Sequence, residues 1–227
     1  VPLTAQGETI GLLVLENLAA AREPDESTTT YIELMSETVG LALANLNLRE
    51  ALRNKALHDS LTGLRNRHEL DETLQRLVVD ADRNDTPLAC LMMDIDHFKR
   101  LNDRYGHDAG DLAIRGVAGA FAGVVRDQGL VFRYGGEEFL MLMPEFDEAR
   151  ALQRAALIRE RIAELDLHHD GLPIGPITVS MGLAVYPRHG ASQSLIATAD
   201  AALFRAKESG RDRVVVAADR HDAREPA

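Results

Sequence analysis

The chain has 227 residues, of which 45% are hydrophobic, so it can bury a core of ordinary size in one large or two small domains. Its 36 Asp and Glu residues outweigh 25 Lys and Arg residues and give a net charge of −11, which argues against a nucleic-acid-binding surface. With one cysteine and no apolar run long enough to span a membrane, it is expected to be cytoplasmic, without disulfides or membrane contact.

Two short strands are predicted at the start of the chain, over residues 1–4 and 10–15, with a turn at Gly7 and Glu8. Because a two-stranded hairpin is not stable alone, we expect the chain to begin inside a larger domain. The segment resembles the last strands of a GAF sensor domain.

A long helix is predicted to begin at Thr30, because Thr30 and Glu33 have the spacing of a capping box. Apolar residues then recur at three- and four-residue spacing as far as Leu57, with no Gly or Pro after Gly40. They are Ile32, Met35, Val39, Ala42, Leu43, Leu46 and Leu52. We expect the helix at 30–57 to dimerise with a second copy and to link a sensor to an output domain. The alternative is a helix that packs only on its own hairpin.

After residues 1–57 the pattern changes to alternating strands and helices, which predict a second domain over residues 58–218 and a polar tail at 219–227. The predicted helices cover 69–81, 97–105, 110–125, 148–165 and 194–209. The predicted strands cover 87–95, a hairpin at 130–143, 177–186 and 214–216. This order fits an α+β fold with one central, mostly antiparallel sheet flanked by helices.

The buried strand at 87–95 is a near-continuous apolar run, which is the pattern of a strand covered on both faces. Cys90 lies within this run and is expected to be a buried small hydrophobe. The run ends in Asp94, Ile95 and Asp96, so two carboxylates are predicted at the carboxyl end of a buried strand.

The hairpin at 130–143 carries an unusual turn. Gly135 and Gly136 lie between two runs of strand-forming residues, which predicts a tight turn with positive φ at glycine. The adjacent carboxylates of Glu137 and Glu138 repel one another and need either open water or a cation. Glycines that admit a phosphate beside carboxylates that can hold a metal indicate a metal–nucleotide site. A solvated hairpin tip is the alternative.

Four motifs occur in order along the second domain. They are Asp59-x-Leu-Thr-Gly-Leu-x-Asn-Arg67, Asp94-Ile-Asp-His-Phe-Lys-x-x-Asn-Asp103, Gly135-Gly-Glu-Glu-Phe139 and Ala206-Lys-x-x-Gly-Arg211. With these motifs the chain resembles the GGDEF family of diguanylate cyclases. The resemblance implies the nucleotide-cyclase-like (palm-like) fold of that family. It also implies an enzyme that condenses two GTP molecules into cyclic di-GMP and two pyrophosphates.

The implied reaction joins the 3′-hydroxyl of one GTP to the α-phosphate of another, so a metal ion must offset the charge of the triphosphate. The expected ion is Mg²⁺, with Mn²⁺ as a substitute. Asp94 and Glu137 supply the one or two carboxylates that Mg²⁺ typically takes from protein, and the resemblance adds the Ile95 carbonyl. Glu137 is also the expected acceptor of the 3′-hydroxyl proton. Glu138 is a further candidate metal ligand, with hydrogen bonding within the hairpin as its alternative role.

The resemblance assigns the guanine base to Asn102 and Asp111. A carboxylate can accept from both N1–H and N2–H₂ of guanine, whereas adenine offers neither donor there. Gly135 and Gly136 would let the backbone approach the α-phosphate. The terminal phosphates are expected to contact the main-chain amides of Phe98 and Lys99 and the side chains of Lys99, Lys207 and Arg211, the last two on one side of a helix end.

One departure from the family pattern concerns product feedback. Many members carry Arg-x-x-Asp nine residues before the glycine pair as a product-binding inhibitory site, whereas this chain has Arg126 and then Gly129 in place of the aspartate. We therefore expect weak or no inhibition by cyclic di-GMP. A milder departure is Asp212, which stands where the family usually has asparagine.

Two other classes of function remain open. One is a catalytically weak module that binds GTP or cyclic di-GMP as a receptor, and the other is an interaction domain whose cyclase core is only a scaffold. The presence of Asp94, Lys99, Glu137 and Arg211 favours an active enzyme. Since one site holds one GTP, that enzyme is expected to act as a homodimer with facing sites.

Overall fold

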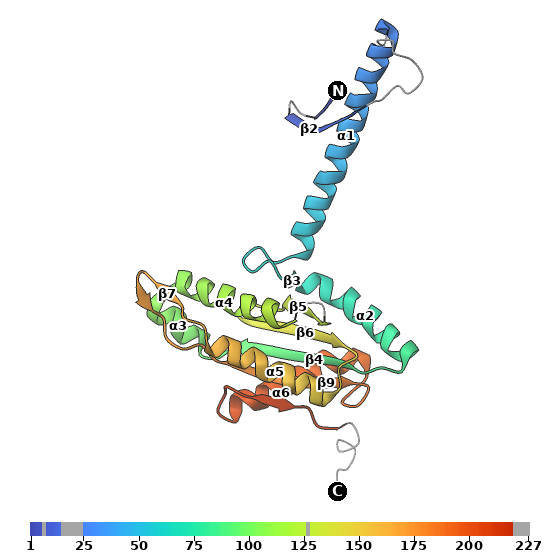
Figure 1. Cartoon of the computed structure of the whole chain (residues 1–227). Helices are drawn as coiled ribbons and strands as arrows, with labels where there is room; N and C mark the ends of the chain where they lie inside the picture. The colour runs from blue at the N-terminus through green and yellow to red at the C-terminus, as the bar shows by residue number, and fades with distance from the viewer. Residues whose placement is uncertain (6–7, 15–24, 126–127, 220–227) are drawn as a thin grey trace. The chain divides into compact units, whose positions relative to one another are not determined.

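The structure is a computed structural model that describes residues 1–5, 8–14, 25–125 and 128–219, without the side chains of 50–56 and 122. It divides into two compact units, Val1–Ala56 and Leu57–Ala227. The first holds an antiparallel hairpin of β1 (Pro2–Ala5) and β2 (Glu8–Leu12), as predicted, and the helix α1 (Glu26–Leu57) (Figure 1). No helix in the described part of the chain is long and apolar enough to cross a membrane.

Helix α1 begins four residues before the predicted start. The Asp25 carboxylate accepts the Thr28 N–H at 2.8 Å and the Ser27 hydroxyl at 3.0 Å, so it caps one of the free amides at the helix start. Thr30 lies inside the helix, and its hydroxyl donates to the Glu26 carbonyl at 2.9 Å. The predicted capping box at Thr30 is therefore wrong, because an aspartate upstream takes the capping role.

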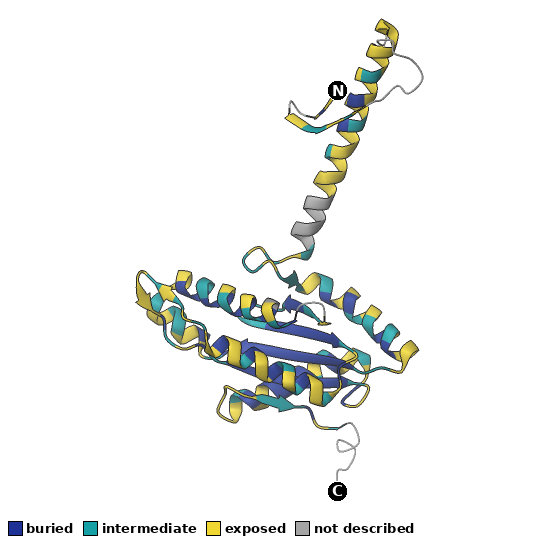
Figure 2. Ribbon diagram, in the orientation of Figure 1, coloured by how far each residue is buried: buried dark blue, intermediate teal, exposed yellow. Residues whose placement is uncertain are grey.

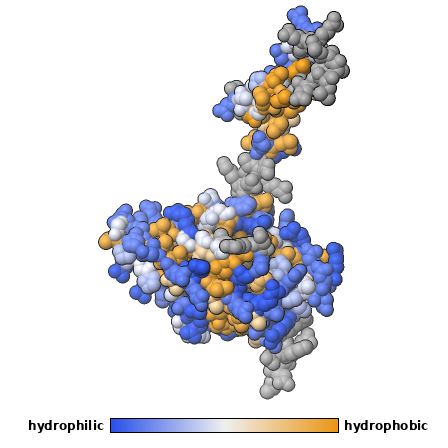
Figure 3. Space-filling model, in the orientation of Figure 1, coloured by the Kyte–Doolittle hydropathy of each residue, from blue (hydrophilic) through white to orange (hydrophobic). Residues whose placement is uncertain are grey.

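Apolar side chains along α1 are exposed in a single copy of the chain. They are Tyr31, Leu34, Met35, Leu41, Leu43, Leu46 and Leu48. Figure 3 shows apolar residues gathered along this helix. Where the hairpin packs on α1, a Cβ at Gly40 would lie 2.6 Å from the Thr4 carbonyl oxygen, so only glycine permits this approach.

The second unit is built on a six-stranded sheet with the strand order β10-β9-β4-β6-β5-β3. Its strands are β3 (Arg65–Asn66), β4 (Leu88–Ile95), β5 (Leu130–Arg133), β6 (Glu138–Pro144), β9 (Val179–Tyr186) and β10 (Val214–Val216). The strands β9, β4, β6 and β5 pair antiparallel, and β10 and β3 join the edges in parallel. The predicted mostly antiparallel sheet is confirmed. A small hairpin of β7 (His168–His169) and β8 (Leu172–Pro173) was not predicted.

Helices cover both faces of this sheet (Figure 1). They are α2 (Arg67–Asn84), α3 (Phe98–Tyr105), α4 (His107–Val125), α5 (Glu148–Ala163) and α6 (Leu195–Glu208), with a short 3₁₀ turn, η2 (Ser192–Ser194), before α6. One core cluster joins the sheet to α4 and α5, and a second joins its other face to α2 and α6. Figure 2 shows the sheet buried between helices whose outer faces are exposed. Strand β4 serves both clusters, because every one of its residues is buried, as its apolar run predicts.

Helix α6 lies unusually close to the sheet at Gly182 of β9. A Cβ at that position would be 2.1 Å from the Ala199 carbonyl oxygen and 2.2 Å from the Leu203 amide nitrogen. Both are backbone atoms of α6, so the absence of a side chain at Gly182 sets the distance between helix and strand.

Candidate active site

The candidate site lies where the carboxyl end of β4 meets the turn between β5 and β6. Asp94 pairs in register with Glu138 on β6 and with Ser180 on β9. The Ile95 N–H donates to the Glu137 carbonyl at 3.3 Å. The sheet therefore brings the second and third sequence motifs into direct contact.

The turn between β5 and β6 differs from the predicted one. Neither Gly135 nor Gly136 has a positive φ, so that prediction is wrong. Instead the Tyr134 and Gly135 amides both donate to the Glu138 carbonyl, at 2.9 and 3.2 Å, and the chain reverses over the four residues between the strands. A Cβ at Gly135 would lie 2.5 Å from a Glu138 carboxylate oxygen, whereas one at Gly136 would meet open space. Gly135 thus makes room for the Glu138 carboxylate, and Gly136 leaves open space beside the turn.

The carboxylates of this site lie in an environment that disfavours their charge. Asp94 is only 7% exposed, and burial raises its pKa, although the Lys207 ammonium 2.7 Å away opposes the rise. Burial also raises the pKa of Glu137, and the neighbouring charges of Asp94 and Glu138 raise it further. A cation placed among these groups would relieve the repulsion between them.

The donor set suits a hard divalent ion. Asp94 and Glu137 offer carboxylate oxygens beside main-chain carbonyls, and Mg²⁺ takes few protein ligands when phosphates complete its shell. Within the four described ranges, no group of three or more His, Cys, Asp and Glu residues is arranged to hold a metal by protein ligands alone. Such an ion would therefore depend on substrate oxygens as well as on the chain.

Two cations lie near Asp94, one in the last turn of α6 and one just after that helix. Lys207 lies in the last turn of that helix and contacts Asp94 directly. Arg211 lowers the pKa of Asp94 through its charge, so it is also close. The prediction that both residues share a helix end is wrong, because α6 ends at Glu208 and Arg211 lies in the following turn with a φ of 57°.

The first turn of α3 follows the carboxyl end of β4 almost directly in the chain. Its N-cap residue, His97, makes no side-chain capping hydrogen bond. The predicted phosphate-binding residues Phe98 and Lys99 open this helix, and the Lys99 side chain is exposed. Helix amides without a capping partner are suited to bind an anion such as phosphate.

The predicted base-binding residues come together between α3 and α4. The Asn102 side-chain oxygen is buried, and among the described residues it has no hydrogen-bond partner. It lies over Gly110, where a Cβ would be 2.0 Å away, and Asp111 follows as a half-buried carboxylate. Buried polar atoms are nearly always hydrogen-bonded in proteins, so a lone acceptor here indicates a ligand that brings a donor.

A second network around the glycine turn was missed at the level of sequence. Arg133 donates to the Gly136 carbonyl at 2.8 Å and to the Gly135 carbonyl at 3.2 Å. Its Nη1 also donates to both oxygens of the Asp59 carboxylate, at 2.9 and 3.0 Å. Burial alone would raise the pKa of Asp59, but hydrogen bonds from Thr62 and Arg133 hold it below its usual value. Through Asp59, the first motif thus holds the glycine turn in place.

The predicted feedback residue Arg126 lies outside the described residues. Among the described residues, a cavity of about 460 Å³ is lined by residues around the start of β5, the end of β6 and the start of α5. The Arg150 guanidinium lies over the Phe146 ring at 4.4 Å and donates to the Glu145 carbonyl at 2.7 Å. Gly129 contributes only backbone to this cavity, and the expected weakness of product inhibition stays a prediction.

The comparisons with known proteins agree with this geometry. Residues 56–213, more than half of the chain, match a family model described as "Diguanylate cyclase, GGDEF domain". Over 168 residues, 74% of this chain, the sequence is 40% identical to diguanylate cyclase DgcP of Pseudomonas aeruginosa. Over 165 residues, 73% of this chain, it is 39% identical to diguanylate cyclase DosC of Escherichia coli. These matches span only 25% and 36% of the two relatives' own lengths.

A solved structure with a similar fold is the coiled coil and GGDEF domain of DgcB from Caulobacter crescentus in complex with c-di-GMP. The two chains are 33% identical, the TM-score is 0.76, and the match covers 83% of this chain and 100% of the other. A second is diguanylate cyclase SiaD of Pseudomonas aeruginosa in complex with its activator SiaC, with 32% identity and a TM-score of 0.69. That match covers 83% of this chain and 72% of the other.

Proposed function

Because the chain belongs to the GGDEF diguanylate cyclase domain family, we propose that it condenses two GTP molecules into cyclic di-GMP and two pyrophosphates. The observation that carries the proposal is the contact of the buried Asp94 with both Lys207 and the glycine turn that holds Glu137. Acidic groups with raised pKa beside phosphate-binding cations suit a reaction in which negative charge moves between phosphate oxygens.

In this proposal Asn102 and Asp111 hold the guanine base. The amides that open α3, together with Lys99, Lys207 and Arg211, hold the triphosphate. Glu137 accepts the proton of the attacking 3′-hydroxyl.

A divalent ion, Mg²⁺ or Mn²⁺, would supply charge neutralisation at the triphosphate. Asp94, the Ile95 carbonyl and Glu137 would hold it. Glu138 is a weaker candidate ligand, because its carboxylate lies against Gly135 within the turn.

The proposed enzyme is a homodimer, because one site holds one GTP and the reaction needs two. The exposed apolar side chains on α1 support this part of the proposal, since apolar side chains exposed on a long helix are suited to pack against a second copy. The hairpin of β1 and β2, packed on α1 at Gly40, is proposed to be the end of a GAF-like sensor domain.

The test is an incubation of the protein with GTP and Mg²⁺, with cyclic di-GMP measured by mass spectrometry. Glu137→Gln is expected to lower the rate on the order of a hundredfold or more, because it removes the base and a metal ligand together. Glu160→Gln, at an exposed position on α5, is the matched control and should keep the full rate. A folded wild type that binds GTP without forming product would instead support the receptor function.

A further inference from the structure

The Asp96 carboxylate, next to the site but assigned no role in it, accepts three hydrogen bonds from two other segments of the chain. It accepts the Thr178 hydroxyl at 2.8 Å and the Ser180 hydroxyl at 2.6 Å, at the start of β9. It also accepts the main-chain N–H of Asp212 at 3.0 Å, from the turn after α6. The Asp96 carboxylate therefore points toward the start of β9 and toward the chain segment that follows α6.

The turn that Asp96 holds has a strained backbone. Gly210, Arg211 and Asp212 follow one another with φ values of 108°, 57° and 43°. For residues other than glycine this region costs about 1–3 kcal/mol each, so it persists only where surrounding contacts enforce it. A turn of this kind relaxes toward ordinary angles when its contacts are removed.

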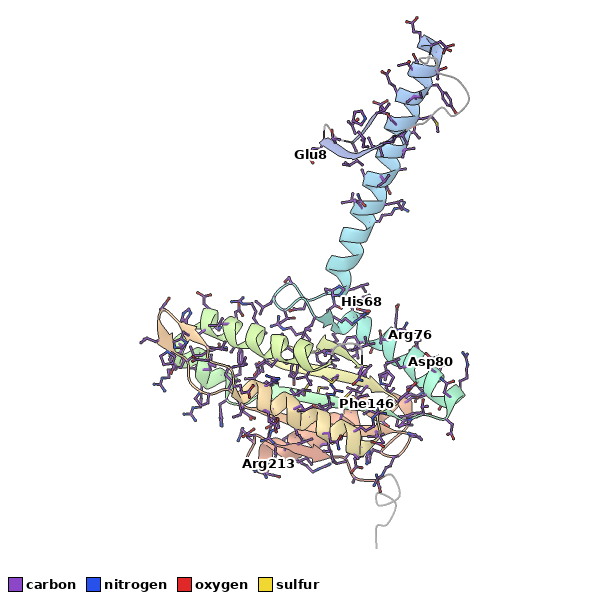
Figure 4. The ribbon with its side chains drawn as sticks, in the orientation of Figure 1. Glu8, His68, Arg76, Asp80, Phe146 and Arg213 are labelled. Atoms are coloured by element: carbon purple, nitrogen blue, oxygen red, sulfur yellow. The ribbon has the colours of Figure 1, made fainter. Side chains whose placement is uncertain are left out.

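Two further hydrogen bonds hold the same turn, and both come from residues close to it in the sequence. The Arg211 N–H donates to the Ala206 carbonyl at 3.0 Å, and the Arg213 guanidinium donates to the Arg211 carbonyl at 2.9 Å. Arg213, labelled in Figure 4, lies just before β10. Only the Asp96 contact, of these three, ties the turn to the end of β4 and so to Asp94.

A fourth contact is weak by comparison. The Asp212 side chain pairs with Arg159 of α5 at 2.8 Å, but the two side chains are 51% and 34% exposed. Exposed ion pairs contribute little to the stability of a local conformation. Asp96 is half-buried and is itself held by the fully buried Ser180 and by Thr178, so it is the contact expected to decide where the turn lies.

The position of this turn matters because it carries Arg211. Lys207 lies within α6, so the helix fixes its place, whereas Arg211 lies beyond the helix end and depends on the turn. We propose that Asp96 is a positioning residue that holds the strained turn after α6 so that Arg211 faces the terminal phosphates of GTP. The inference rests on the proposed function for the identity of the nucleotide, and it assigns Asp96 no contact with substrate.

The test is the variant Asp96→Asn. Asparagine removes the charge and leaves one acceptor oxygen for three donors, so the contact with the Asp212 N–H is no longer charge-assisted. Affinity for a non-hydrolysable GTP analogue, measured by calorimetry, is expected to fall roughly tenfold, the effect of one lost charge-assisted contact. Affinity for GMP, which lacks the terminal phosphates, should stay within about twofold. An equal loss for both nucleotides would overturn the proposal, because it would reveal a general disturbance of the site.

A double-mutant cycle with Arg211→Gln tests the route of the effect. If Asp96 acts through Arg211, then Asp96→Asn adds almost nothing to the loss already caused by Arg211→Gln. Additive losses would overturn the proposal. Arg159→Ala, which removes the exposed contact of the same turn, is the matched control and should leave GTP-analogue affinity within about twofold of wild type.

A milder variant covers the case in which Asp96→Asn does not fold. Thr178→Val keeps the shape of the side chain but removes a donor to the same Asp96 oxygen that accepts the Asp212 N–H. It should weaken the GTP analogue on the order of threefold and leave GMP unchanged, and no change for either nucleotide would count against the proposal. Because binding is measured, a protein that binds GTP in this way but makes no cyclic di-GMP would refute the proposed activity and leave the role of Asp96 standing.

Discussion

Replacing Gly110 with alanine should separate the stability of α4 from the recognition of guanine. The new Cβ would lie 2.0 Å from the Asn102 side-chain oxygen and 3.1 Å from the Phe98 ring. The first distance cannot be tolerated, but the atom concerned is the end of a flexible side chain. Asn102 is therefore expected to swing away while the backbone of α4 stays in place.

The two effects of Gly110→Ala have opposite signs. Alanine is more favourable than glycine inside a helix by up to about 1 kcal/mol, so the melting temperature should hold or rise. Loss of the hydrogen bond between Asn102 and the base should cost about 1–3 kcal/mol, which corresponds to a rise in the KM for GTP of roughly five- to a hundredfold. The variant is thus expected to be at least as stable as the wild type and much poorer in substrate binding.

The assay combines thermal unfolding with steady-state synthesis of cyclic di-GMP over a range of GTP concentrations. Gly119→Ala is the matched control, because it lies on the same helix and its Cβ would meet open space. It should gain the same helix stability with no change in KM. A Gly110→Ala protein with wild-type KM, or one that no longer folds, would refute the reasoning that Gly110 exists to make room for Asn102.

Three further outcomes are expected. Gly182→Ala should lower the melting temperature sharply, because its Cβ would collide with α6 backbone at Ala199, and calorimetry would measure the loss. Asp59→Asn should destabilise the protein most above pH 4, because the lowered folded-state pKa of Asp59 means that its ionised carboxylate stabilises the wild type there. Protonation at lower pH weakens the pairing with Arg133 in the wild type. The melting temperatures of the two proteins should therefore converge as the pH falls below about 3.9. Cys90, whose pKa burial raises to about 12, should react with iodoacetamide only after unfolding, and rapid labelling of the native protein would contradict its burial.

Local patterns in the sequence were enough to predict the strand at the centre of the sheet and its hairpin neighbour. The run that ends at Asp94 has no polar residue on either face, so burial on both sides was the simplest reading, and the structure confirms it. Placement of the helix start failed because Asp25 and Thr30 are both good caps, and residue type alone does not decide between them.

The parts of the site that the sequence did not predict depend on contacts between distant segments. Asp59 and Arg133 are 74 residues apart, and Asp96 and Asp212 are 116 apart. Neither pair has a periodicity or a spacing that marks it. Each becomes visible only when the sheet has set β3 beside β5 and β4 beside β9.

Gly182 influences the position of Lys207, although the two residues are not in contact. Helix α6 rests on this glycine at Ala199, and from Ala199 to Lys207 the helix runs about 12 Å at 1.5 Å per residue. A helix of that length moves as a rigid rod, so a shift of the helix at Gly182 is carried to the backbone of Lys207, whose ammonium lies beside Asp94. The position of the Lys207 charge in the site therefore depends on a residue far from it, Gly182, because only glycine lets α6 lie this close to β9.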